Sequence, residues 1–314
     1  MKAYIMIEKW FVIINPVSGG KKAPKLWHKI KPLLDDAAIT YETGITEYFD
    51  HAALLTYNAI IGGSRNILII GGDGTAGEVV NGIFKTAIDP SEITIAMVHA
   101  GTGNDWVRTI GKYKRIIEIP SALINKKTFK HDVGIIQYTS EGQKKKRYFI
   151  NIAGLGFEGY VVKRLRDNNN SGQFKGGKMR YWIAILRSLL FCKHSLVTLN
   201  VDGNVSQHKS LSIACGICNY NGSGLKQLPN AKFDDGQLDM TMIGDMSKFN
   251  MVKNLPRLTN GSHIKLKQVK TFRGKEIIIE SDTPIYVEAD GEFLGETPVK
   301  ITVEQNALQV LKWR

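Results

Sequence analysis

A run of apolar residues that passes directly into a glycine-rich turn is the feature that most constrains the fold of this chain. Residues 67–70 read ILII, and the chain continues as GGDGTAGEVVNG over residues 71–82. An uninterrupted apolar run is typical of a strand buried on both faces, as in a parallel sheet covered by helices. The glycines that follow would present backbone N–H groups at the start of a helix, which suits phosphate. The pattern therefore predicts a strand, loop and helix that bind a phosphate group.

Two further apolar runs, WFVIINP (10–16) and ITIAMVHAG (93–101), have the same character, and helices are expected over 24–34 and 77–85. After about residue 132 the pattern changes to short strands, many of alternating polarity, with little helix between them; an exception is 156–193, which is helical in its flanks. Such strands are typical of an antiparallel sandwich. We therefore predict an α/β + β chain. A three-layer α/β domain with a mostly parallel sheet covers 1–132, and an antiparallel β-sandwich covers 133–314. The active site is expected in the cleft between them, and the last strand has the option of returning to the first domain.

The charge of the chain is positive and unevenly distributed. It carries 42 Lys and Arg against 29 Asp and Glu, a net charge of +13, and the excess lies mainly after residue 132. Residues 163–193 are the most basic stretch and contain a basic amphipathic pattern over 180–193. An anionic partner is expected, such as a phosphate ligand, a nucleic acid or a membrane surface. No apolar run approaches the roughly 20 residues that span a bilayer, and the beginning of the chain lacks a secretion signal, so we expect a cytoplasmic protein.

Three loops follow strands of the predicted parallel sheet: 15–22 (NPVSGGKK), 71–77 (GGDGTAG) and 99–105 (HAGTGND). Open α/β sheets bind ligands at the carboxyl ends of their strands, so three such loops together indicate a nucleotide site. The spacing Gly72-x-Gly74-x-x-Gly77 also satisfies the dinucleotide pattern. Asp73 argues against that interpretation, because its charge would repel a pyrophosphate unless a cation lay between them. The Gly-Lys-Ser/Thr of a P-loop is missing as well.

The chain resembles the lipid kinases of the diacylglycerol kinase and sphingosine kinase type. The resemblance rests on motifs in order along nearly the whole chain: NPVSGG (15–20), GGDGTAGEVVNG (71–82), AGTGNDWVR (100–108), HDVG (131–134), FINIAGLGFEG (149–159), FDDGQLDM (233–240) and VEADGEFLG (287–295). It implies ATP and Mg²⁺ as cofactors. Two places depart from the usual family pattern, namely His99-Ala100 and Trp106. These departures affect the expected choice of acceptor more than the activity.

The resemblance also implies roles for individual residues. ATP would be bound by residues of the three loops and by Thr46, namely Asn15, Pro16, Val17, Ser18, Gly19, Thr46, Gly71, Gly72, Asp73, Gly74, Thr75, Ala76, Gly77, Glu78, Gly101, Thr102, Gly103 and Asn104. The catalytic residues would be Glu292, Asp73, Asp132 and Lys178, with Glu292 as the general base and Asp73 as the alternative. A structural Mg²⁺ would be held by Asp235 and by backbone carbonyls near Lys232 and Gln237.

These observations lead us to expect an ATP-dependent kinase that phosphorylates a lipid hydroxyl while bound to the anionic inner face of a membrane. Diacylglycerol, giving phosphatidic acid, is the expected acceptor; a sphingoid base, ceramide or phosphatidylglycerol are alternatives. A soluble NAD kinase is the rival enzyme, because it shares a GGDGT-like loop. A basic nucleic-acid-binding protein is the rival outside enzymes, but carboxylates inside the glycine loops argue against nucleic acid as a partner. A homodimer is one arrangement that the sequence leaves open.

Overall fold

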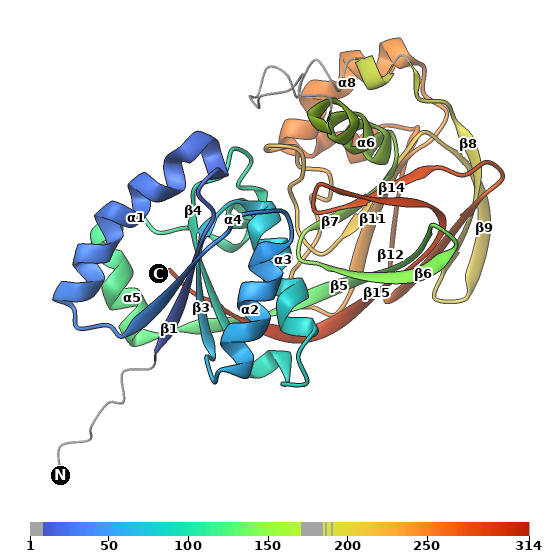
Figure 1. The fold of residues 1–314 in the computed structure, drawn as a ribbon. Coiled ribbons are helices and arrows are strands. Elements are labelled where there is room, and N and C mark those ends of the chain that lie inside the picture. The colour runs from blue at the N-terminus through green and yellow to red at the C-terminus, as the bar shows by residue number, and fades with distance from the viewer. Residues whose placement is uncertain (1–8, 171–184, 186, 190, 314) are drawn as a thin grey trace. The chain divides into compact units, whose positions relative to one another are not determined.

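The computed structural model describes residues 9–170, 185, 187–189 and 191–313 (Figure 1). The chain divides into two compact units. The first runs up to His131 and takes in the chain from Asn306 onward, and the second spans Asp132–Gln305.

The first unit is built on a parallel sheet, which confirms the predicted fold of this half. The strand order is β2-β1-β3-β4, with the end of β15 beside β4. The central strands consist of the apolar runs that predicted them, and every residue of β3 is buried. The strands are β1 (Trp10–Ile14), β2 (Tyr41–Ile45), β3 (Asn66–Gly71) and β4 (Thr94–His99).

Helices cover both faces of this sheet (Figure 1). Alternate residues of each strand point to opposite faces, so both faces present side chains that pack against a helix layer. On one side, α1 and α5 pack on a cluster that includes Val12, Leu68 and Val98, while α2 and α3 lie on the other side. The helices are α1 (Ser18–Asp36), α2 (His51–Ile61), α3 (Asp73–Phe84), α4 (Asp105–Ile110) and α5 (Ile119–Asn125), with short 3₁₀ turns at Pro90–Glu92 and Ile116–Glu118.

The second unit is antiparallel and sandwich-like, as predicted. One row of strands runs β12-β11-β10-β7-β14-β15, and β15 also pairs with β13 and β5, which lead to β8, β9 and β6. These strands are β5 (Thr128–Ser140), β6 (Gln143–Phe149), β7 (Ile152–Gly156), β8 (Ser195–Val201), β9 (Asn204–Ser210), β10 (Ser212–Gly216), β11 (Leu238–Ile243), β12 (Val269–Gly274), β13 (Glu276–Ser281), β14 (Tyr286–Ala289) and β15 (Glu292–Leu311).

Two helices of the second unit pack on one side of its strands. They are α6 (Phe157–Asn170) and α8 (Lys248–Asn260), and a 3₁₀ turn follows at Ser262–Lys265. An apolar cluster that includes Phe157, Val161 and Met251 joins the two helices to the strands beneath them. The sequence did not predict α8.

The longest strand, β15, belongs to both units. It is one continuous strand of 20 residues. Its last part pairs in parallel with β4, with Gln309 opposite Thr94 and Val310 opposite Ile95. Leu308, Val310 and Leu311 are buried there, so the end of the chain contributes core side chains to the first unit.

Candidate functional site

The three loops predicted to form a nucleotide site do meet at the carboxyl edge of the parallel sheet. A side chain added at Gly19 would lie 1.7 Å from the carbonyl oxygen of Ala100, so the first loop packs directly on the third. The second and third loops touch through Gly72 and Gly101, where a Cβ on Gly101 would lie 2.8 Å from the Gly72 Cα. The glycines are therefore needed for close approach of three backbone segments.

Side chains of the first two loops also join them. Asn15 donates a hydrogen bond from Nδ2 to the Oγ1 of Thr75 at 2.9 Å, and its Oδ1 accepts one from the Val17 amide at 3.2 Å. Gly19, Gly20 and Lys21 then turn the chain through three left-handed residues before regular helix begins. Because two of the three are glycines, this turn carries little strain.

The N-terminus of α3 is the part of this edge best suited to an anion. Gly72 precedes the helix in extended conformation, and Asp73 and Gly74 form its first turn. The first N–H groups of a helix have no partner within the helix and carry its positive dipole end. Gly74 is exposed, and no atom lies within 4 Å of the place where its side chain would be. A phosphate is thus able to approach the backbone at Gly74.

Asp73 is oriented by the loop that follows β4. Its Oδ2 accepts a hydrogen bond from the amide of Asp105 at 3.0 Å, and its Oδ1 accepts one from the amide of Trp106 at 3.1 Å. Burial raises the pKa of Asp73, and these backbone hydrogen bonds oppose the rise. Both carboxylate oxygens therefore bind the first turn of α4, so the side chain fixes one loop against another.

Two other predicted ATP ligands are Glu78, within α3, and Thr46, just after β2. Glu78 accepts a hydrogen bond through Oε2 from the amide of Ala52 at 3.0 Å, in the first turn of α2. Thr46 follows β2, is buried, and donates from its amide to the carbonyl of Ile14 at 2.9 Å. Thr102 and Gly103 belong to the third loop, and Asn104 adopts a left-handed conformation just before α4. The remaining predicted ligands, Pro16, Val17, Ser18, Gly71, Ala76 and Gly77, lie in the first two loops or the first turns of α1 and α3.

The carboxylate of Asp132 is completely buried in the second unit. Its Oδ2 accepts a hydrogen bond from the amide of Gly236, and its own amide donates to the carbonyl of Phe233, both at 2.7 Å. Asp132 therefore holds the loop that contains Asp235.

Asp235, the predicted Mg²⁺ ligand, forms an ion pair with Arg273, and its Oδ1 accepts a hydrogen bond from the Gln237 amide at 3.2 Å. The guanidinium thus occupies the position that a cation would take beside Asp235. Within the described part of the chain, no group of three or more His, Cys, Asp or Glu side chains is placed to hold a metal ion. The predicted site combines the Asp235 side chain with backbone carbonyls near Lys232 and Gln237, and it remains a prediction.

Glu292 begins β15 directly after the Asp290-Gly291 turn. Its Oε2 lies 2.6 Å from Nη2 of Arg147, and both side chains are largely buried. Arg147 belongs to the basic run 144–147, which forms part of β6. The pair brings a positive charge to the carboxylate that the sequence assigned as general base.

Lys178 lies outside the described residues, as does most of the basic stretch 163–193. Of that stretch, Lys163 forms an ion pair with Asp167 at 3.1 Å, and Arg164 lies over the ring of Phe191 at 5.3 Å from its centre.

Two buried glutamates that sequence reasoning missed approach the same point beside Gly154. A side chain added there would lie 2.4 Å from the Cβ of Glu158 and 2.5 Å from Oε1 of Glu288. Burial raises the pKa of Glu158 to about 7 and that of Glu288 to about 8. The signal in the sequence was a glutamate inside an apolar motif, in GLGFEG and in YVEA.

Comparisons with known proteins agree with this architecture. The family described as "Diacylglycerol kinase catalytic domain" matches residues 9–136, and "YegS C-terminal NAD kinase beta sandwich-like domain" matches 155–312. A diacylglycerol kinase of Mycobacterium tuberculosis is 30% identical over 310 residues, which cover 98% of this chain and 96% of the relative. A diacylglycerol kinase of Staphylococcus aureus is 28% identical, covering 91% of this chain and 87% of the relative.

Solved structures share the fold at lower identity. A diacylglycerol kinase of Bacillus anthracis superimposes with a TM-score of 0.70 at 22% identity, covering 98% of this chain and 97% of that one. Yeast NADH kinase, solved with NADH, superimposes with a TM-score of 0.56 at 11% identity, covering 96% and 82%. The loops, the two units and these relatives define a nucleotide-using phosphotransferase. The chain belongs to the diacylglycerol kinase family and is a lipid kinase.

Among the helices in the described ranges, none is both long enough and apolar enough to cross a membrane.

Proposed function

We propose that the protein transfers the γ-phosphate of ATP to a lipid hydroxyl, with diacylglycerol as acceptor and phosphatidic acid as product. The observation that carries the proposal is the convergence of three glycine loops on the N-terminus of α3. Gly19 against Ala100 and Gly72 against Gly101 keep these backbones in contact. Phosphoryl transfer depends mainly on positioning and charge neutralisation, and backbone N–H groups at this edge supply both to the phosphates.

The hydrogen bonds of the two candidate bases favour Glu292 over Asp73. Both oxygens of Asp73 accept backbone hydrogen bonds, so Asp73 is a positioning residue for the phosphate loop. Glu292 takes the proton of the lipid hydroxyl, and Arg147 orients its carboxylate. Thr46 and Thr102 line the phosphates and ribose of ATP together with the glycine loops. Mg²⁺, when bound with ATP, neutralises charge on the phosphates.

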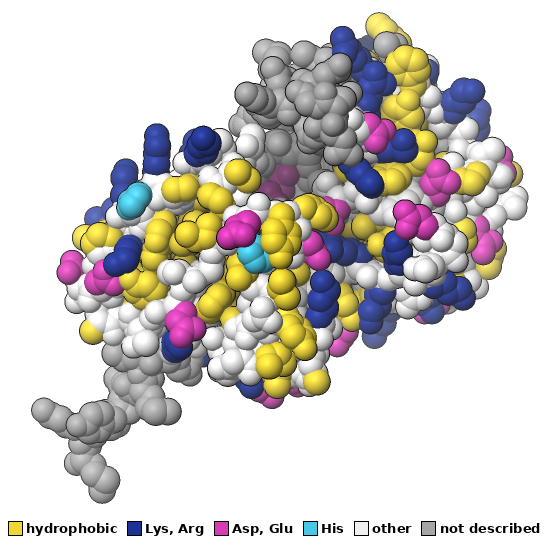
Figure 2. Space-filling model, in the orientation of Figure 1, with side chains coloured by type: hydrophobic (Ala, Val, Ile, Leu, Met, Phe, Trp, Pro, Cys, Tyr) yellow, Lys and Arg dark blue, Asp and Glu magenta, His cyan; other side chains and the backbone are white. Residues whose placement is uncertain are grey.

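We also propose that the protein docks on the anionic inner face of a membrane through the outer face of α8. Phe249 is 77% exposed and Val252 44% exposed, and Lys253 and Arg257 are exposed on the same helix. Figure 2 shows hydrophobic and basic side chains next to each other over this part of the second unit. Exposed aromatic residues among cations suit a lipid surface, where each nearby Lys or Arg contributes about 1 kcal/mol.

A lipid panel tests the proposed activity. The protein is incubated with labelled ATP, Mg²⁺ and mixed micelles of diacylglycerol, monoacylglycerol, ceramide, a sphingoid base or phosphatidylglycerol, with NAD as the soluble acceptor. We expect labelled phosphatidic acid, a loss of at least 100-fold in Glu292→Gln, and little change in Glu296→Gln, an exposed glutamate of the same strand. Phosphorylation of NAD alone would replace this proposal with an NAD kinase.

A further inference from the structure

The hairpin that carries Glu292 turns through two residues, Asp290 and Gly291. Both have positive φ, 49° and 82°, as in the tight turns that join two antiparallel strands. Ala289 at the end of β14 pairs with Glu292 at the start of β15. In such a turn the amide of the second residue is not part of the strand ladder, so the amide of Gly291 is available to another partner.

Glu288 supplies that partner from inside the protein. Its side chain is 1% exposed, and its Oε2 accepts a hydrogen bond from the Gly291 amide at 2.8 Å. Glu288 pairs with Phe293 one step further along the hairpin, and neighbouring residues of a strand point to opposite faces. Glu288 and Glu292 therefore lie on opposite faces, and Glu288 acts on the turn through the backbone.

The carboxyl group of Glu288 is also held at its other oxygen. Oε1 accepts a hydrogen bond from Asn221 Nδ2 at 3.3 Å, and the Gly222 amide orients Asn221 by donating to its Oδ1 at 2.8 Å. Gly154 lies opposite Glu288 in β7, and a side chain there would lie 2.5 Å from Oε1. The glycine thus leaves room for the carboxyl group in the orientation that reaches Gly291.

The first residue of the turn is held as firmly as the second. The carboxylate of Asp290 accepts hydrogen bonds from the amides of residues 150–152, at 2.8, 3.1 and 3.2 Å. One carboxyl group therefore binds outward from the turn to the neighbouring chain, and the other binds inward to its backbone. Together they fix the position of the next residue, Glu292.

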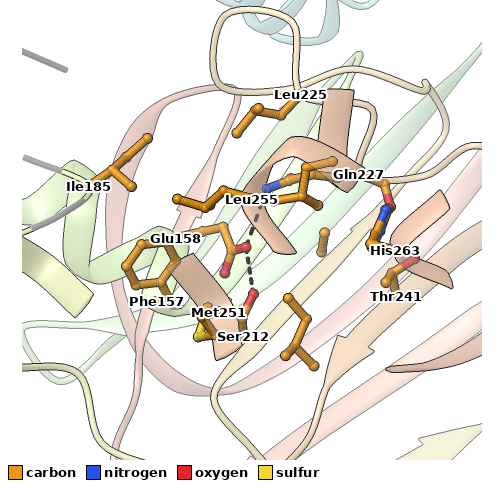
Figure 3. A pocket seen from close by; sticks show the side chains of 13 residues that line it. Phe157, Glu158, Ile185, Ser212, Leu225, Gln227, Thr241, Met251, Leu255 and His263 are labelled. Atoms are coloured by element: carbon orange, nitrogen blue, oxygen red, sulfur yellow. Dashed lines mark hydrogen bonds between the residues drawn. The ribbon is translucent and has the colours of Figure 1, made fainter. Parts of the chain in front are cut away.

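The second buried glutamate, Glu158, has different partners. Figure 3 shows its carboxyl group beneath α8 in an apolar pocket, directed toward Ser212 and Gln227. Its Oε1 accepts hydrogen bonds from the Ser212 hydroxyl at 2.6 Å and from Gln227 Nε2 at 3.3 Å. Of the two glutamates beside Gly154, Glu288 is thus the one bonded to the turn.

We propose that Glu288 is a positioning residue for phosphoryl transfer, because the hydrogen bond that it accepts from Gly291 sets the place of the Glu292 carboxylate. The inference rests on the proposed function, in which Glu292 takes the proton of the lipid hydroxyl. Burial raises the pKa of Glu288 to about 8, so at neutral pH it holds the turn without adding a second negative charge. A misplacement of about 1 Å costs a reaction about 100-fold in rate.

Steady-state kinetics at neutral pH test the role. Glu288→Met fills a similar volume but has no acceptor for the Gly291 amide, so kcat should fall at least tenfold while the KM for ATP stays within twofold. Glu288→Gln keeps an oxygen for Gly291 at the expense of the longer contact with Asn221, and its kcat should stay within threefold of wild type. A wild-type kcat in Glu288→Met would overturn the proposal.

A second variant keeps the test valid if Glu288→Met does not fold. Glu288→Asp retains the acid, but its carboxyl group is one methylene too short to reach the Gly291 amide. Its kcat should also fall at least tenfold, and an unchanged value would refute the positioning role.

Asp202→Ala is the matched control for loss of a carboxyl group that holds a turn. Asp202 also precedes a glycine in a hairpin of the second unit, and it accepts hydrogen bonds from the amides of Lys275 and Glu276 at 2.8–3.1 Å. This variant should be less stable in urea but keep kcat within twofold. A fall in its kcat as large as that of Glu288→Met would show that instability alone lowers the rate, and the proposal would be wrong.

Hydrogen exchange of the Gly291 amide, followed by NMR on protein made with isotope-labelled glycine, tests the hydrogen bond without any substrate. Gly291 is exposed, so its protection depends on the bond to Glu288. Exchange should be at least tenfold faster in Glu288→Met than in wild type, and equal rates would overturn the proposal.

The outcomes separate this inference from the proposed function. If wild type phosphorylates diacylglycerol and Glu288→Met keeps its kcat, the positioning role is wrong and the kinase reaction stands. If wild type phosphorylates none of the lipids but Glu288→Met speeds exchange at Gly291, the proposed reaction is wrong and the hold of Glu288 on the turn stands.

Discussion

Replacing Glu288 by glutamine should make the stability of the protein less dependent on pH. Glu288 is 1% exposed, accepts hydrogen bonds from Gly291 and Asn221, and has the carboxyl groups of Asp290 and Glu158 nearby. Burial is the main cause that raises the pKa of Glu288 to about 8, and the neighbouring carboxylates raise it further. Glutamine has the shape of the protonated acid but does not titrate.

The sign and size of the effect follow from proton binding. An unfolded chain releases the Glu288 proton near pH 4.5, whereas the folded chain retains it up to about pH 8. The stability that this group contributes is therefore complete below pH 4.5 and is lost as the pH rises through 8. At 1.36 kcal/mol for each pH unit, the difference is roughly 5 kcal/mol, a large part of the 5–15 kcal/mol that stabilises typical proteins.

Urea unfolding at several pH values between 5 and 9, followed by circular dichroism, measures this difference. Wild type should lose several kcal/mol relative to Glu288→Gln across the range, because all other titrating groups are common to both proteins. Hydrogen exchange at β7 and β14 should locate the loss in the second unit. Parallel stability curves for the two proteins would show that Glu288 is ionised in the folded state, and the reasoning would be wrong.

Three further predictions concern the loops and the membrane surface. Gly19→Ala should abolish ATP binding in a titration, because its Cβ would lie 1.7 Å from the Ala100 oxygen. Gly20→Ala is the control: Gly20 has a similar φ, but no atom lies within 4 Å of its Cβ position, so this variant should lose only about 1 kcal/mol of stability. Asp73→Asn should lower stability in thermal unfolding by about 1 kcal/mol and reduce kinase activity, because an amide cannot accept both hydrogen bonds from α4; full activity would contradict its positioning role. Phe249→Ala should reduce sedimentation of the protein with anionic vesicles severalfold. Equal sedimentation of the wild-type protein with neutral and with anionic vesicles would refute electrostatic docking.

The parts of the fold that were predictable are those in which burial leaves a simple pattern. β3 is a continuous apolar run because both its faces are covered, and β4 is similar. β2 escaped prediction because it is an edge strand in which only Gly44 is buried. The helix α8 was missed because it contains Pro256 in its interior. The start of α3 was placed at Gly77, four residues late, because glycines usually mark a loop, whereas here they form the first turn of a helix.

The candidate site was predictable where it consists of loops. The three glycine loops could be identified because close backbone packing demands glycine at consecutive positions. The partners of the carboxylates could not be predicted. The hydrogen bonds that Asp73 accepts from the amides of α4, and the ion pair of Arg147 with Glu292, join residues that are distant in sequence. Glu158 is similar: only the structure shows that α8 encloses it in an apolar pocket.

The course of β15 has a consequence for how the protein is made. The first unit takes one of its strands, and the buried Leu308, Val310 and Leu311, from the last residues of the chain. A ribosome must therefore release the chain as far as Leu311 before this sheet is complete, so the nucleotide-binding half cannot finish folding ahead of the half that follows it. Contacts this distant in sequence slow folding and prolong the exposure of apolar strand edges. Deletion of residues 308–311 should accordingly damage the half of the protein that is synthesised first.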